Sequence, residues 1–119
     1  MKSRARPELL TMLVEGRFPI EAICDELAGY PWDADEPLVV LRREHIASIL
    51  QRYLRRELTA AQVSAWADAL EVRDDVGFSE EDSAEIEQTI FVLANPPLNG
   101  ELTFETARTL LDALGAKDV

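Results

Sequence analysis

Apolar residues recur at helical spacing through most of the chain, whereas strand-like alternation is almost absent. The strongest pattern lies in DADEPLVVLRREHIASILQRYLRRE, where the recurring positions are Ile46, Ile49, Leu50, Tyr53 and Leu54. This spacing predicts the longest helix, with Pro37 suited to its first turn. The run PLVVL alone is also typical of a short buried strand. We favour helix because the periodicity continues well beyond that run.

The segment RELTAAQVSAWADAL contains a clear helix start. Thr59 is placed to cap the helix, and Gln62, three residues later, can complete a capping box. We expect this helix to end near Arg73. Its apolar stripe consists of Val63, Trp66, Ala67 and Leu70.

Two short helices are predicted before the long one. The first runs from about Pro7 to Glu15 and is stopped by Gly16, and the second follows Pro19 through Leu27.

Two more helices are predicted in the last third of the chain. Ser79 begins one of them, and Asp82, three residues later, stands at the second position of a capping box. After the loop NPPLNG, Thr103 caps the last helix and Gly115 ends it. The inward stripe of the first is Ile86, Ile90, Leu93 and Ala94, and that of the second is Phe104, Ala107, Leu110, Leu111 and Leu114.

The phrase around Thr59 returns around Thr103 as GELTFETARTLLDAL, 103 − 59 = 44 residues later. The same shift places Ile46 on Ile90 and Ile49 on Leu93. Duplication of a helical hairpin and independent capping of two helices both explain the repeat.

These patterns predict an all-α fold, a single-domain bundle of about five helices over residues 1–119. We divide it into an N-terminal helical extension (1–36), a first hairpin (37–78) and a second hairpin (79–119).

Composition narrows the class of partner. The chain has 119 residues, 47% of them hydrophobic, which is enough for one core. Its net charge of -11 and pI of about 4.4 make nucleic acid an unlikely partner and favour a basic protein. No segment has the roughly 20 apolar residues of a membrane span. With one cysteine and no signal-peptide pattern, we expect a cytoplasmic protein.

Candidate catalytic and metal residues are few. A nucleophilic pair would have to be Cys24 with His45, each the only residue of its kind, and we expect both to be structural. One cysteine and one histidine cannot make the usual zinc sites, and no stretch fits the calcium-binding EF-hand loop or a phosphate-binding glycine loop. We therefore expect no enzyme activity, no cofactor and no metal.

Acidic residues gather around the turn RDDVGFSEED, opposed within that stretch only by Arg73. One interpretation is a solvated face with acids at a helix N-terminus. The other is a protein-binding surface with Phe78 and Trp66 as apolar anchors. The predicted partner-binding residues are Asp68, Glu71, Asp74, Asp75, Phe78, Glu80, Glu81, Asp82 and Glu85.

The stretch ILQRYLRRELTAAQVSAWADAL resembles the opening of colicin D-type immunity proteins and related small bacterial self-protection proteins. The resemblance implies an acidic helical bundle that binds a cationic nuclease toxin and occludes its active site. We therefore expect a small binding module, an immunity or inhibitor protein. The alternatives are a structural module that forms a homodimer and, third, a metal protein or enzyme.

Overall fold

The computed structural model describes residues 5–17, 19–31, 35–71, 73–96 and 100–115. The described residues form six α-helices, a short 3₁₀ turn and two short strands. The helices are α1 (Arg6–Val14), α2 (Ile20–Leu27), α3 (Arg43–Leu54), α4 (Ala60–Glu71), α5 (Ser83–Ala94) and α7 (Phe104–Ala113). The strands are β1 (Val39–Leu41) and β2 (Val76–Phe78), and the 3₁₀ turn η1 is Glu80–Asp82.

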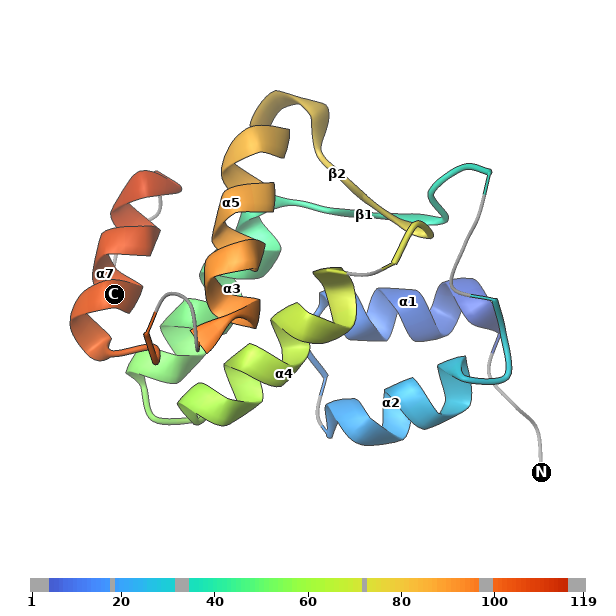
Figure 1. Ribbon diagram of the computed structural model, residues 1–119, viewed down its shortest axis with the longest axis horizontal. Helices are drawn as coiled ribbons and strands as arrows, with labels where there is room; N and C mark the ends of the chain where they lie inside the picture. Colours follow the sequence, from blue (N-terminus) through green and yellow to red (C-terminus); the bar gives the residue numbers. More distant parts are fainter. Residues whose placement is uncertain (1–4, 18, 32–34, 72, 97–99, 116–119) are drawn as a thin grey trace.

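The helices pack in pairs along the molecule. α1 lies beside α2 at one end, α7 packs against α3 at the other, and α4 packs most extensively against α5 (Figure 1). The last helix therefore contacts α3 more than its neighbour in sequence, α5. Duplication of a hairpin and independent capping both remain explanations of the repeat.

The fold is mainly helical, but the expectation of an all-α protein was wrong. β1 and β2 form a two-stranded parallel sheet, with Val39 paired to Val76 and Leu41 to Phe78. The bundle has six described α-helices rather than about five.

The long helix predicted from Pro37 begins only at Arg43. Val39 and Val40 are β-branched and favour the extended backbone, and a strand partner lies far along the chain. Gly77 lets β2 lie close to Pro37, because a Cβ at residue 77 would be only 2.9 Å from the Pro37 ring.

Ser79 does not start a regular α-helix. Its backbone N–H donates to the carbonyl of Leu41 at 3.0 Å, so it continues β2. The chain then makes the turn η1, and α5 starts at Ser83. Pairing with β1 therefore outweighs the local helix-start signal.

Trp66 lies at the centre of the core. Its side chain is fully buried, and its indole Nε1 donates to the carbonyl of Leu13 at 2.7 Å. A buried indole N–H needs such a partner, and this bond ties α4 to α1. Trp66 is thus a core residue, and its predicted role as a surface anchor was wrong.

Asp75 makes another polar contact between distant segments. Its carboxylate is fully buried between Arg6 at 3.0 Å and Arg73 at 2.9 Å. Each guanidinium makes two hydrogen bonds to it. The pair of arginines offsets the cost of burying the charge and fixes α1 against the start of β2.

Candidate functional site

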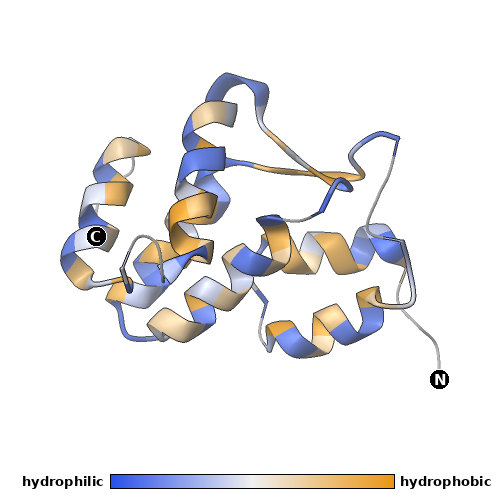
Figure 2. Ribbon diagram, in the orientation of Figure 1, coloured by the Kyte–Doolittle hydropathy of each residue, from blue (hydrophilic) through white to orange (hydrophobic). Residues whose placement is uncertain are grey.

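The predicted acidic residues extend from the end of α4, which lies beside the end of α5, through β2 to η1 and the first turn of α5 (Figure 1). In Figure 2 the turn that leads into α5 is hydrophilic. We call the exposed acids here the acidic corner: Glu71, Asp74, Glu80, Glu81, Glu85 and Glu87.

Local structure explains why acids are tolerated at this place. Glu80 and Glu81 lie in η1, and Glu85 lies in the first turn of α5. The unsatisfied N–H groups of a helix start carry partial positive charge, which stabilises nearby carboxylates. None of the acidic corner residues forms an ion pair with another described residue.

Two of the predicted partner-binding residues, Asp75 and Asp82, already lie beside arginines of the same chain. Asp75 is buried between its two arginines and cannot contact a partner. Asp82 lies 3.7 Å from Arg43, with 19% of its side chain exposed. The arginines nearest to the corner therefore neutralise these two acids rather than the exposed ones.

A groove of about 400 Å³ opens beside the corner. Phe91 on α5 is 40% exposed, and it shares the groove with Phe78 of β2. No basic residue is found among the described side chains that line it. The lining is Glu71, Phe78, Ala84, Glu87, Gln88, Ile90 and Phe91.

The carboxylate of Glu71 is held in place at the groove. The side-chain amide of Asn95 donates to its Oε2 at 3.0 Å and also donates to the carbonyl of Phe91 at 2.8 Å. This link between α4 and α5 fixes an acceptor beside an aromatic ring. A cation entering the groove would meet both at once.

Of the predicted residues, Glu71 and Phe78 line this groove, whereas Glu80 and Glu81 in η1 and Glu85 in the first turn of α5 do not. Asp68 does not line this groove. It borders another hollow, of about 410 Å³, between α4, the end of α5 and residues 100–106.

Sequence reasoning missed Phe91 as an anchor. It directly follows Ile90, a residue of the buried stripe, so a turn of about 100° places it on the flank of α5. An aromatic residue just outside an apolar stripe is the only signal the sequence offers.

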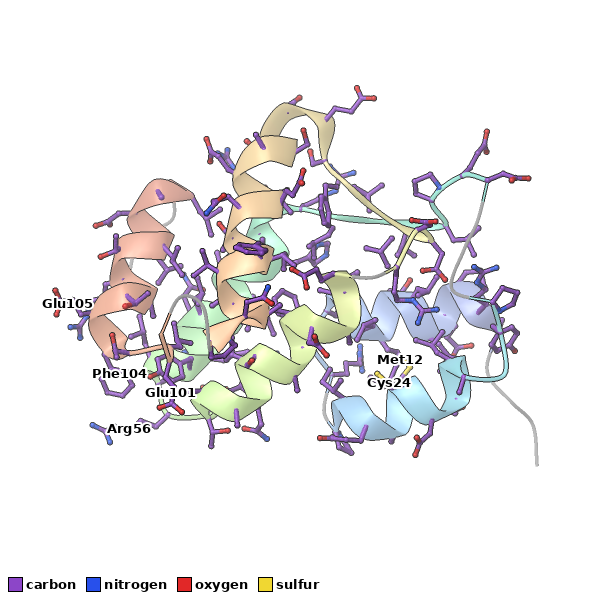
Figure 3. The ribbon with its side chains drawn as sticks, in the orientation of Figure 1. Met12, Cys24, Arg56, Glu101, Phe104 and Glu105 are labelled. Atoms are coloured by element: carbon purple, nitrogen blue, oxygen red, sulfur yellow. The ribbon has the colours of Figure 1, made fainter. Side chains whose placement is uncertain are left out.

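The two candidate nucleophilic residues lie in unreactive settings. Cys24 on α2 lies beside Met12 of α1 (Figure 3), and burial raises the pKa of its thiol. Burial lowers the pKa of His45, whose Nδ1 accepts the backbone N–H of Arg42 at 2.9 Å. Within the described ranges no three metal-ligating side chains gather.

Comparisons with known proteins give no relative for this chain. No family model, no curated protein and no solved structure matches it. Among the described helices, none has both the length and the apolar composition needed to span a bilayer.

Proposed function

We propose that this protein binds a basic protein and blocks it, acting as an inhibitor or immunity protein. The observation that carries the proposal is the groove between β2, α4 and α5, where two phenylalanines lie together with two glutamates that form no ion pair with another described residue. The local resemblance to colicin D-type immunity proteins suggests the mode of action, which is occlusion of a cationic site.

An arginine or lysine side chain of the partner fits this groove chemically. Its cation would lie over Phe91 or Phe78, which contributes about 0.5–2 kcal/mol depending on how far the site is desolvated. Glu71 and Glu87 would accept its hydrogen bonds. Guanidinium suits this combination best, because it stacks on rings and binds carboxylates with two parallel bonds.

The surrounding acids would act at longer range. Glu80, Glu81 and Glu85 extend the negative surface beyond the groove and would steer a basic partner toward it. A few buried contacts, rather than the whole acidic area, would then determine how long the complex lasts.

The proposal is tested by affinity purification from the native host with wild-type protein and two double variants. Glu71→Lys with Glu87→Lys reverses the groove, whereas Glu21→Lys with Asp25→Lys makes the same charge change on exposed positions of α2. We expect the wild type and the α2 variant to recover the same basic partner and the groove variant to lose it.

A third variant separates shape from charge. Phe91→Ala keeps the net charge and should weaken binding of the recovered partner about tenfold or more, as expected for a central aromatic anchor. If the groove variant and Phe91→Ala both bind that partner like the wild type, the assigned surface is wrong.

A further inference from the structure

The hollow that Asp68 borders is a second candidate site, separate from the groove beside the acidic corner. It has a volume of about 410 Å³ and lies between one face of α4, the end of α5 and residues 100–106. In the part of the chain that the structure describes, the hollow and the groove share no lining residue. Sites for small molecules usually enclose about 300–1,000 Å³, so this hollow has the size of a ligand site.

Short side chains on α4 create the hollow. Ala60, Ser64 and Asp68 recur every four residues along this helix, so they lie on one face of it. Ala61 and Ala65 stand beside them on the same face. Apart from Asp68 these side chains are too short to fill the space toward residues 100–106, whereas facing elements normally pack without such a gap.

The floor of the hollow is apolar. Val63 and Leu93 are buried, and Val92, Ala94 and Leu102 are half-buried around them. Figure 2 shows that α5 is hydrophobic toward its C-terminal end, which borders the hollow. The floor therefore suits the apolar part of a ligand, which is driven out of water by the hydrophobic effect.

The mouth of the hollow is negatively charged. Asp68 projects from α4, and Glu101 projects from the segment that leads into α7 (Figure 3). Both side chains are exposed, and neither forms an ion pair with another described residue. The described lining contains no basic side chain. The mouth therefore attracts a cation and repels an anion.

The end of α5 strengthens this preference. In a longer helix the carbonyls of Val92 and Leu93 would accept the N–H groups of residues 96 and 97. Both of those residues are prolines, which have no N–H, so these two bonds cannot form. The carbonyl end of a helix carries partial negative charge, and here it borders the hollow.

We propose that this hollow binds a small organic amine. A compact apolar group of the ligand fills the floor, and its ammonium lies at the mouth, where Asp68, Glu101 and the carbonyl end of α5 favour a positive charge. The ammonium donates hydrogen bonds to oxygen acceptors there and keeps part of its hydration.

The order of apolar and charged parts favours a free amine over a lysine of another protein. A lysine side chain enters a hollow with its ammonium first, which would place the charge on the apolar floor and the methylene stem at the acidic mouth. Burying an ammonium against apolar walls is costly. A free amine enters with its apolar end first and matches both parts.

NMR titration of ¹⁵N-labelled protein with 2-phenylethylamine, which is an ammonium at neutral pH, tests the proposal. We expect saturable shifts of backbone amides confined to residues 60–68, 92–95 and 100–106, with a Kd of about 1 mM or below. 2-Phenylethanol has nearly the same shape without the charge and should bind about fivefold more weakly, as expected for exposed ion pairs. The anion 3-phenylpropanoate should cause no saturable shift in these residues.

Charge removal separates binding from folding. Asp68→Asn with Glu101→Gln should weaken the amine about fivefold and leave the affinity of the alcohol unchanged, because only the ammonium needs the carboxylates. Glu21→Gln with Asp25→Asn makes the same charge change at exposed positions of α2 and should leave both probes unchanged. A purely structural role of the two carboxylates would weaken both probes alike and overturn the proposal.

Filling the hollow tests its shape. Ala65→Leu should weaken the amine and the alcohol alike, about tenfold or more, while Ala22→Leu at an exposed position of α2 should affect neither. Leucine favours a helix almost as much as alanine does, so both variants should fold.

The outcomes that overturn the proposal are specific to this hollow. They are no saturable shift up to about 10 mM amine, shifts centred on other residues, or equal binding of the amine and the alcohol. N-acetyl-lysine N-methylamide should bind about tenfold more weakly than 2-phenylethylamine. Equal binding of that lysine derivative would assign the hollow to a protein side chain instead. The groove and its proposed inhibitory function are unaffected by any of these results, because no lining residue is shared among the described ones.

Discussion

Asp75 shows how a single residue can change role between sequence and structure. In the sequence it is one of several acids in a turn, but in the fold it is a fully buried carboxylate between two guanidiniums. Arg6 and Arg73 have 18% and 12% of their side chains exposed, so the carboxylate of Asp75 is compensated by two largely buried guanidiniums. Asp75 therefore belongs to the architecture and not to the binding surface.

Asp75→Asn should destabilise the protein strongly. Asparagine removes the negative charge that Arg6 and Arg73 share, which costs about 3 kcal/mol by analogy with other broken buried pairs. Urea unfolding followed by circular dichroism measures the change. Asp74→Asn, at the exposed neighbouring position, should change the free energy of unfolding by less than about 0.5 kcal/mol; similar losses in the two variants would contradict the assignment.

His45 should make stability depend on pH. Burial lowers the pKa of its imidazole below the ordinary value of 6.5, so the unfolded chain binds more protons than the fold does in this range. The stabilising contribution of neutral His45 is complete above about pH 6.5 and is lost as the pH falls toward the lower pKa of the folded state. Protonation of Nδ1 would also remove the acceptor for the backbone N–H of Arg42 and place a second N–H against it.

His45→Gln isolates this effect. Glutamine at this position can still accept the N–H of residue 42, as in an ordinary capping box, but it does not titrate. Unfolding free energies measured from about pH 7.5 to about pH 5 should fall less steeply in the variant than in the wild type. Parallel pH profiles would assign the dependence to other groups.

At the scale of elements, each threonine cap should contribute to the free energy of unfolding as much as an ordinary N-cap does. Thr59 and Thr103 each accept a backbone N–H at 3.1 Å, from Gln62 and Thr106 respectively. Replacing either by alanine should cost about 1 kcal/mol, or about 4 °C in the unfolding temperature.

Thr109→Ala is the matched control for the caps. The Thr109 hydroxyl bonds to the carbonyl of Glu105 inside α7 at 3.0 Å, where it caps nothing. Because alanine favours a helix interior more than threonine does, this variant should be neutral or slightly more stable. A loss equal to that of the cap variants would mean that the caps contribute nothing specific.

The elements that the sequence predicted well are those fixed by local signals. The Thr59 capping box is present, with Gln62 accepting the N–H of Thr59 at 2.8 Å, and Thr103 caps α7 as expected. The strands could not be predicted in the same way, because β1 is defined by β2, and Val39 and Val76 are 37 residues apart along the chain. Non-local pairing leaves no periodic signal in a window of a few turns.

At the scale of the whole molecule, the sequence predicts the charge of the proposed binding surface but not which residues lie together on it. The clustering of acids could be predicted, because these residues are close together in the sequence itself. It could not reveal that Asp75 is buried, that Asp68 borders a different hollow, or that Phe91 lies beside Phe78. Those facts depend on how α4, α5 and β2 are placed relative to one another.

Ionic strength should act mainly on the association rate of the complex. Screening shortens from about 30 Å at 0.01 M salt to about 8 Å at 0.15 M, so steering by a chain of charge -11 should weaken. With the recovered partner, the association rate should fall about tenfold or more over this range while the dissociation rate changes less. Surface plasmon resonance at several salt concentrations separates the two rates, and a salt-independent association rate would exclude electrostatic steering.

The contact between Arg6 and Asp75 also has a consequence for biosynthesis. The two residues are 69 positions apart, so at about 5–20 residues per second the ribosome adds Asp75 roughly 3–14 s after Arg6. Until residue 66 is added α1 lacks the Trp66 indole, and until residue 75 is added Arg6 lacks the carboxylate of Asp75. We expect nascent chains that end before residue 75 to be cleaved readily by protease near α1, and released full-length chains to resist cleavage there.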